Sequence, residues 1–302
     1  MGKIPVGETI SGAYGFAFAD FLSVLGIAWL PHVIYLLLIA GIVYGLAPEL
    51  PGQIMRGQID MTTLYELQRI GGLLWIVGVV TQSMVTVGLQ KKALGQMPGA
   101  TFFYFSLGAP VWRMIGAVFL AVIAYVFIVI LTAIVAVALA LVAGKFAGHF
   151  GTAIAVIVGI IAVCWVIYAA VRLFFFLPAV VVAEEQIGLV RSWELGGGNF
   201  WRIFAVMFVV FIPVAIGFGI VQNALIGPFL APDMFTHFHF HENMTPEEFG
   251  NFYLTILKGV FRTMRAAWPL ILALAVIRSI LFLGLGNGAV AKAYLGVTGK
   301  PA

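Results

Sequence analysis

Long runs of apolar residues, each nearly free of charge, are the feature that most limits how this chain can fold. The run at 112–143 contains one charged residue, Arg113. A bilayer offers no water to backbone amides, so a spanning segment satisfies them within a helix or a closed barrel, and a helix needs about 20 apolar residues. The runs are rich in Leu, Ile, Val and Ala, which favours helices. Six runs qualify: 21–46, 70–89, 112–143, 150–172, 201–229 and 265–286.

The sequence therefore predicts an all-α integral membrane protein with six transmembrane helices. Hydrophobic residues make up 63% of the chain and charged residues 9%, which excludes an ordinary soluble protein. The one cysteine, Cys164, lies in an apolar run and fits a small core residue. Basic residues are spread along the predicted membrane edges, so no nucleic-acid partner is expected.

The number of spans and the basic residues beside them predict the orientation. An even number of crossings places both termini on one side, and this side carries the larger share of flanking Lys and Arg. The excess predicts that both termini are cytoplasmic. Four prolines, Pro31, Pro178, Pro213 and Pro269, lie in or beside the runs. Such prolines are tolerated in membrane helices, so we expect kinks there and not helix ends.

A glycine triplet in the stretch RSWELGGGNFWRIF, at 191–204, suggests either a ligand loop or a joint at the membrane surface. Neither the P-loop pattern nor the dinucleotide-binding pattern is present. Trp193 and Trp201 suit headgroup depth, and Arg191 and Arg202 can extend toward lipid phosphates. The apolar side chains of 186–195 cover one face of a helix, as in a helix lying on a membrane. We expect the glycines to end this helix.

Asn199 follows the glycines and is a plausible N-cap of the next span, because its side chain can accept from the unpaired amides of the first turn. Asp20 has the same place before the first span. Short matches among the segments that precede the spans suggest a threefold repeat. Its units are 1–99, 100–181 and 182–302, each with an interfacial segment followed by a two-span hairpin.

The motif around this joint resembles a known family. Arg172, Pro178 and Glu184, followed by Ser192-Trp193-Glu194-Leu195 and Asn199-Phe200-Trp201-Arg202, are similar to the signature of the glycerophosphoryl diester phosphodiesterase membrane-domain family. The segment ahead of the first span and the tail AKAYLGVTG are also similar. The resemblance implies a bacterial inner-membrane helical protein. It implies no phosphodiesterase activity, because no segment here could encode the catalytic barrel found in some members.

Charged residues near the same joint allow two interpretations. Arg172, Glu184, Glu185, Arg191 and Arg202 could form one cytoplasmic network around Pro178 that fixes how the third unit docks on the second. Alternatively, each residue makes a separate, solvated contact with lipid headgroups, worth about 1 kcal/mol or less.

A histidine cluster, His237, His239 and His241, lies in the external segment 231–260 between the last two spans. Strand spacing places all three on one face and helical spacing pairs the first with the last, so either backbone can offer imidazoles to Zn²⁺. The alternative is an interfacial loop in which the intervening Phe residues enter lipid. Thr245-Pro246-Glu247-Glu248 then predicts a helix over 246–260, whose apolar face packs on the protein or membrane, or binds a partner.

Polar side chains within the spans are further candidates, because ionisable residues in a membrane often mark a site. Arg278 lies in the sixth span and either snorkels to the inner surface or belongs to a binding site. His32, next to Pro31, could be hydrogen-bonded at a kink. Gln82 and Asn223 could bridge helices. No acidic residue lies deep in any span, which weakens the case for a proton- or sodium-coupled carrier.

Soluble-enzyme motifs such as HExxH, GxSxG and CxxC are absent from the sequence, so we expect a protein without catalytic activity. The first hypothesis is a scaffold in envelope organisation or lipid homeostasis, whose partners are membrane lipids or another membrane protein. A carrier or channel for a small or lipid-like solute is the second. A metal-binding protein that uses the external histidines is the third.

Overall fold

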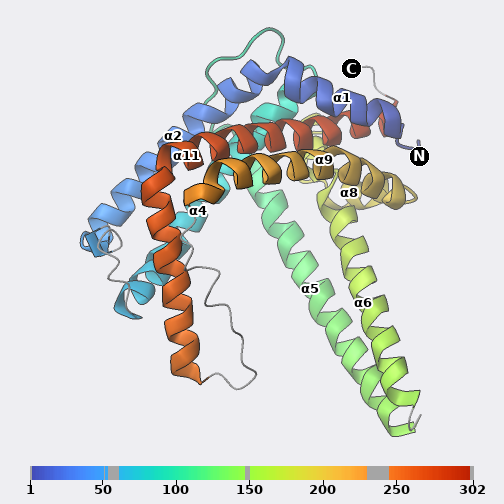
Figure 1. Cartoon of the computed structure of the whole chain (residues 1–302). Helices are drawn as coiled ribbons and strands as arrows, with labels where there is room; N and C mark the ends of the chain where they lie inside the picture. Colours follow the sequence, from blue (N-terminus) through green and yellow to red (C-terminus); the bar gives the residue numbers. More distant parts are fainter. Residues whose placement is uncertain (1, 51, 54–60, 147–149, 230–244, 300–302) are drawn as a thin grey trace.

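The computed structural model describes residues 2–50, 52–53, 61–146, 150–229 and 245–299 (Figure 1). Within these ranges the chain is helical and contains no strand. Six helices are long and apolar enough to cross a membrane, which confirms the predicted fold class. The helices are α1 (Val6–Ala19), α2 (Phe21–Leu46), α4 (Met61–Ala93), α5 (Ala109–Phe146), α6 (Gly151–Phe174), α7 (Leu177–Ala183), α8 (Leu189–Gly196), α9 (Phe200–Ile226) and α11 (Pro246–Thr298).

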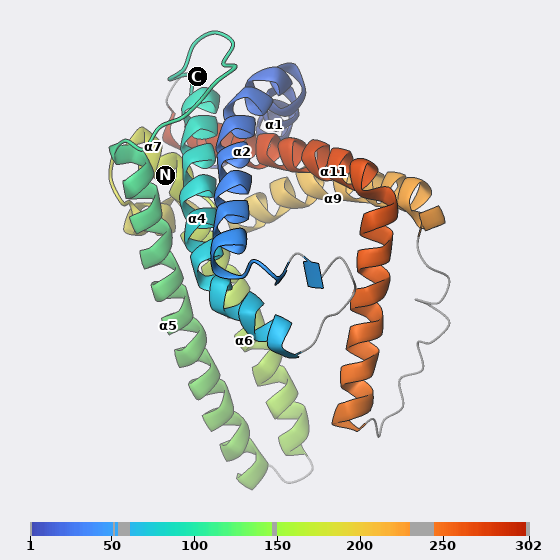
Figure 2. The same cartoon turned by 90° about the vertical axis from the view of Figure 1, so that its left-hand side faces the viewer.

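These helices do not all run in one direction. α5 and α6 form a hairpin that projects from one end of the molecule, and α2 with α4 forms a second pair beside it (Figures 1 and 2). α9 and the second part of α11 lie side by side and run across the direction of both pairs. α1 packs along α11 and also contacts α9.

The α5–α6 hairpin exposes apolar side chains on nearly all sides. Only 6% of the apolar window of each of its two spans is buried in the protein, compared with 33% in the spans of α2 and α4. Phe127 on α5 and Ile161 on α6 are 67% and 62% exposed. A helix that is apolar all round needs an apolar surrounding. With six helices long and apolar enough to span a bilayer, the chain is a multi-pass membrane protein.

The short helix α7 lies at the centre of the packed core. Leu177 and Val181 belong to a cluster with side chains of α2, α4 and α5, whereas Val180 belongs to a second cluster with α1, α9 and α11. All three are almost completely buried. Different side chains of this seven-residue helix thus belong to the two clusters and join them.

Small residues allow α1 and α11 to approach closely. A Cβ atom added to Gly284 would lie 3.1 Å from the Cα of Ala17, and one added to Gly288 would lie 3.2 Å from the Cα of Ala13. Glycines four residues apart on one helix therefore face alanines four apart on the other. This is the small-residue packing typical of membrane helices. We call the contact the α1–α11 seam.

Pro213 lies inside α9, as expected, and its missing amide is replaced from another helix. The carbonyl of Val209, four residues earlier, has no amide to accept from because proline carries no N–H. The Tyr14 hydroxyl of α1 donates to this carbonyl at 3.1 Å and lies 3.3 Å from the carbonyl of Val210. The proline therefore creates an acceptor that α1 occupies.

The other prolines differ in their effects. Pro31 lies inside α2. α11 has its non-helical residue at Ala267, two residues before Pro269, so a kink near this proline is confirmed. The expectation for Pro178 was wrong, because α6 ends at Phe174 and the proline lies in the first turn of the separate helix α7. Proline is well suited to a first turn, where its missing N–H removes no bond.

The three proposed repeat units differ in their entry segments. α1 and α8 are helical, but the second entry segment, at the start of the unit 100–181, has no helix before Ala109 and covers α2. The indole of Trp29 donates to the carbonyl of Phe102 at 2.8 Å, and the absent side chain of Gly26 leaves room for the backbone of Thr101. The threefold repeat itself stays a prediction.

Candidate functional site

Arg172, at the end of α6, holds α8 in place. Its Nε and Nη2 donate to the carbonyl of Trp193 at 2.9 and 2.6 Å, and Nη1 donates to the hydroxyl of Tyr168 at 2.9 Å. The guanidinium also lies 4.3 Å from the centre of the Trp193 ring. The fully buried hydroxyl of Ser192 lies 3.1 and 3.0 Å from the carbonyls of Arg172 and Leu173. α6 and α8 therefore each donate hydrogen bonds to backbone carbonyls of the other.

The glycine triplet is explained by this joint and not by a ligand. A Cβ on Gly196 would lie 3.2 Å from the Cα of Arg172, and one on Gly197 would lie 3.0 Å from its Nη2. Gly198 has a φ of +73°, which favours glycine. α8 ends at Gly196, so the prediction that the glycines terminate the surface helix is confirmed.

Glu184, just after α7, connects three segments. Its Oε1 accepts from the hydroxyl of Tyr294 at 2.9 Å and from Nε of Arg191 at 3.2 Å, and its Oε2 accepts from Gln186 at 2.8 Å. Burial opposes ionisation of this carboxyl, but the hydrogen bonds from Tyr294, Arg191 and Gln186 outweigh it and hold the pKa of Glu184 below its ordinary value. The carboxylate thus links α7 to α8 and α11.

The expected charged cluster is divided into separate contacts. Arg191 pairs with Glu184, and Arg113 of α5 pairs with Glu185 at 3.3 Å. Arg172 and Arg202 instead donate to backbone carbonyls. Arg191 and Arg202, expected to extend toward lipid phosphates, both have partners within the protein. Trp201 is 75% exposed, in accord with an interfacial position.

The side chain of Asn199 does not cap α9. Its Oδ1 accepts from the amide of Ile4 at 3.1 Å, and its Nδ2 donates to the carbonyl of Leu195 at 3.2 Å. Arg202 completes the contact by donating to the carbonyl of Ile4 at 2.8 Å. Asn199 is the residue that precedes α9, as predicted, but its side chain makes no cap bond, because its oxygen accepts from the buried amide of Ile4. Asp20 likewise makes no cap bond, and its carboxylate lies 3.9 Å from Nζ of Lys92.

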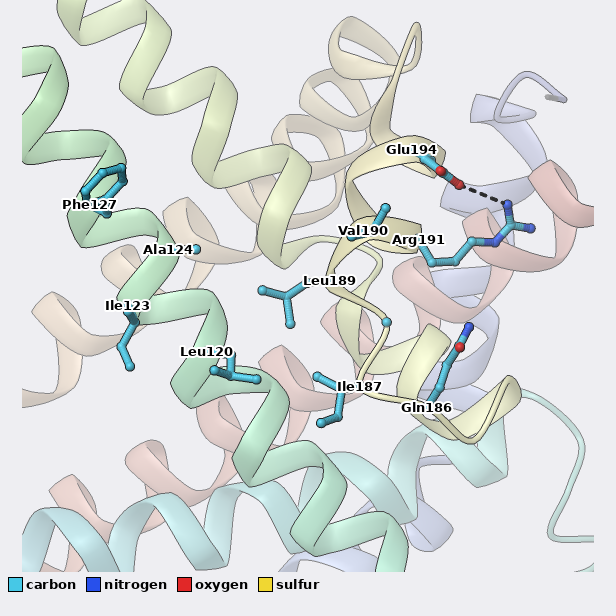
Figure 3. Close-up of a pocket in the computed structure, with 11 residues that line it drawn as sticks. Leu120, Ile123, Ala124, Phe127, Gln186, Ile187, Leu189, Val190, Arg191 and Glu194 are labelled. Atoms are coloured by element: carbon cyan, nitrogen blue, oxygen red, sulfur yellow. Dashed lines mark ion pairs between the residues drawn. The ribbon is translucent and has the colours of Figure 1, made fainter.

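An apolar groove of about 780 Å³ opens between α5 and the segment that leads into α8. Figure 3 shows its two walls, with the polar side chains on the side of the α8 wall away from α5. These are Gln186, Arg191 and Glu194, and Nη1 of Arg191 lies 3.6 Å from the Glu194 carboxylate. The apolar walls consist of Leu120, Ile123, Ala124 and Phe127 on α5, and Ile187, Leu189 and Val190 opposite. The groove therefore offers an apolar floor beside paired charges.

The intramembrane polar residues have different surroundings. The ring Nδ1 of His32 lies 2.6 Å from the carbonyl of Ala28, so this nitrogen carries the proton. Gln82 and Asn223 are exposed, and neither bridges two helices within the part of the chain that the structure describes. Arg278 is exposed beside a cavity between α9 and α11.

Gln90 and Asn287 are the interhelical amide pair that the sequence analysis missed. The Nε2 of Gln90, on α4, donates to Oδ1 of Asn287, on α11, at 3.0 Å, and both side chains are buried. Asn287 lies between Gly286 and Gly288, a signal of close helix approach that could have indicated it. Tyr294, the partner of Glu184, belongs to the tail motif noted for its family resemblance.

His237, His239 and His241 lie outside the described residues, so the predicted zinc site stays a prediction. Among the residues that the structure describes, no three His, Cys, Asp or Glu side chains are grouped to hold a metal ion. Comparisons with protein families, with characterised proteins and with solved structures find no match to this chain. The family resemblance of the joint therefore also stays a prediction.

Proposed function

We propose that this chain is a non-catalytic, lipid-binding scaffold of the bacterial inner membrane, with both termini in the cytoplasm. The observation that carries the proposal is the groove between α5 and α8. Its walls are apolar and its polar groups are confined to one side, at the α8 wall. A membrane lipid has the same division, with acyl chains and a polar headgroup.

The position of the groove also supports a lipid ligand. One wall is α5, a helix whose apolar side chains are exposed on most sides and therefore face acyl chains. The other wall leads into α8, whose Arg191 pairs with the partly buried Glu184. A lipid in the groove would thus contact both the projecting hairpin and the joint that orders α6, α7 and α8. In this proposal the scaffold function couples the hairpin to the bound lipid.

A matched pair of variants tests the proposal. Ala124→Trp places a large ring in the groove, whereas Val122→Trp adds the same ring to an exposed position of α5 that does not line it. Native mass spectrometry of the purified proteins measures how many lipids stay bound as detergent is removed. We expect Ala124→Trp to lose at least one lipid that the wild type and Val122→Trp retain. Equal lipid retention by all three proteins would refute the groove as a lipid site.

A further inference from the structure

A second polar site lies between α9 and α11, away from the α5–α8 groove. A cavity of about 390 Å³ opens there, and Arg278 lines it. Arg278 is separated from Arg265 and from Lys292 by 13 and 14 residues, or about 20 Å of helical rise in each direction. The backbone of Arg278 is therefore well separated along α11 from both of these charges.

Arg278 has no counter-charge in the part of the chain that the structure describes. Among the described residues it contacts the ring of Phe282, whose centre lies 5.5 Å from the guanidinium carbon. Arg172 and Arg191, by comparison, are held by carbonyls or carboxylates. An unpaired cation in an apolar segment is unfavourable and is usually compensated by a partner of opposite charge. An anionic ligand would supply the counter-charge that the described residues do not.

The cavity also supplies neutral hydrogen-bonding groups and an apolar surface. Gln222 of α9 and Ser279 of α11 line it, so an amide and a hydroxyl accompany the guanidinium. Such a set of donors suits the oxygens of a phosphate, which arginine binds through two parallel hydrogen bonds. The remaining lining is apolar and includes Phe218, Ile226 and Leu274.

We propose that this cavity binds the phosphate of an anionic glycerophospholipid, through Arg278, Gln222 and Ser279. The acyl chains lie along the exposed apolar side chains of α9 and α11, among them Ile220 and Val276. A free inorganic anion would leave these side chains without a partner.

Binding of a short-chain phosphatidylglycerol, compared with the phosphatidylcholine of equal chain length, tests the site in detergent. Arg278→Gln should lower the preference for phosphatidylglycerol about tenfold, and Gln222→Ala should lower it several-fold while keeping the charge of the chain. Arg265→Gln removes the same charge from an exposed position near the start of the span and should leave the preference unchanged. Unfolding transitions of the variants establish that each is folded.

Three results would overturn the proposal. The first is an unchanged preference in both Arg278→Gln and Gln222→Ala. The second is an equal loss in Arg265→Gln, which would indicate only a diffuse attraction to net charge. The third is equally tight, Arg278-dependent binding of inorganic phosphate, which would assign the cavity to a free anion. The groove variants Ala124→Trp and Val122→Trp should not affect this preference, so the two proposals fail separately.

Discussion

The hydrogen bond from Tyr14 to the carbonyl of Val209 provides the sharpest test of how the helices are held together. Tyr14→Phe removes the hydroxyl but keeps the ring, which stacks on Phe18. In the wild-type background the carbonyl is then left without a donor, because Pro213 has no N–H. In a Pro213→Ala background the new amide can occupy the same carbonyl. The cost of Tyr14→Phe should therefore depend on residue 213.

The structure sets the expected size of the effect. An intramolecular hydrogen bond contributes about 1 kcal/mol net in water, and side-chain bonds between membrane helices average about 0.6 kcal/mol. We expect Tyr14→Phe to lower the free energy of unfolding by about 1 kcal/mol when Pro213 is present, given that the acceptor is left unpaired. With Ala at 213 the loss should fall below about 0.5 kcal/mol, leaving a coupling energy near ~0.5 kcal/mol.

Reversible unfolding in mixed micelles, followed by the fluorescence of the seven tryptophans, measures all four proteins of this double-mutant cycle. Tyr44→Phe is the control, because Tyr44 is 64% exposed at the end of α2. An equal cost of Tyr14→Phe in both backgrounds, or a cost no greater than that of Tyr44→Phe, would contradict this role of the hydroxyl. The first result would mean that the hydroxyl does not replace the amide missing at Pro213.

Three further predictions follow from the joint and the seam. The lowered pKa of Glu184 contributes stability that is complete above the ordinary carboxyl pKa of 4.5 and is lost as pH falls through the lower pKa of the folded protein. Unfolding free energies of wild type and Glu184→Gln should therefore differ at neutral pH and converge in acid. Gly288→Leu should cost about 1–3 kcal/mol by overpacking the α1–α11 seam, as measured by chemical unfolding, whereas Gly217→Leu, in open space, should cost little. Asn199→Ala should speed hydrogen exchange of the Ile4 amide, and unchanged exchange would contradict the assigned contact.

Features that depend on local sequence could be predicted, and those that depend on distant partners could not. The six spans follow from the length and apolar character of each run, and the end of α8 follows from its glycines. The side chain of Asn199 was assigned to the nearest helix, but its acceptor oxygen is used by Ile4, 195 residues away. The glycine triplet indicated a break in the chain, yet the crowding that explains Gly196 comes from Arg172 on another helix.

The candidate site shows the same limit. Arg172, Glu184 and Arg191 were identified as a cluster because they are close in sequence. The sequence could not predict which of these residues pair with each other. One partner of Glu184 is Tyr294, which is 110 residues away. Hydropathy also cannot predict the direction of α9 relative to α5, because it indicates the length of a span and not its tilt.

The α1–α11 seam has a consequence for how the protein is made. Ala13 and Ala17 are translated before Gly284 and Gly288, which cover them. The Tyr14 hydroxyl likewise meets its acceptor across 195 residues. During synthesis the contact face of α1 is therefore unpaired until α11 has been made.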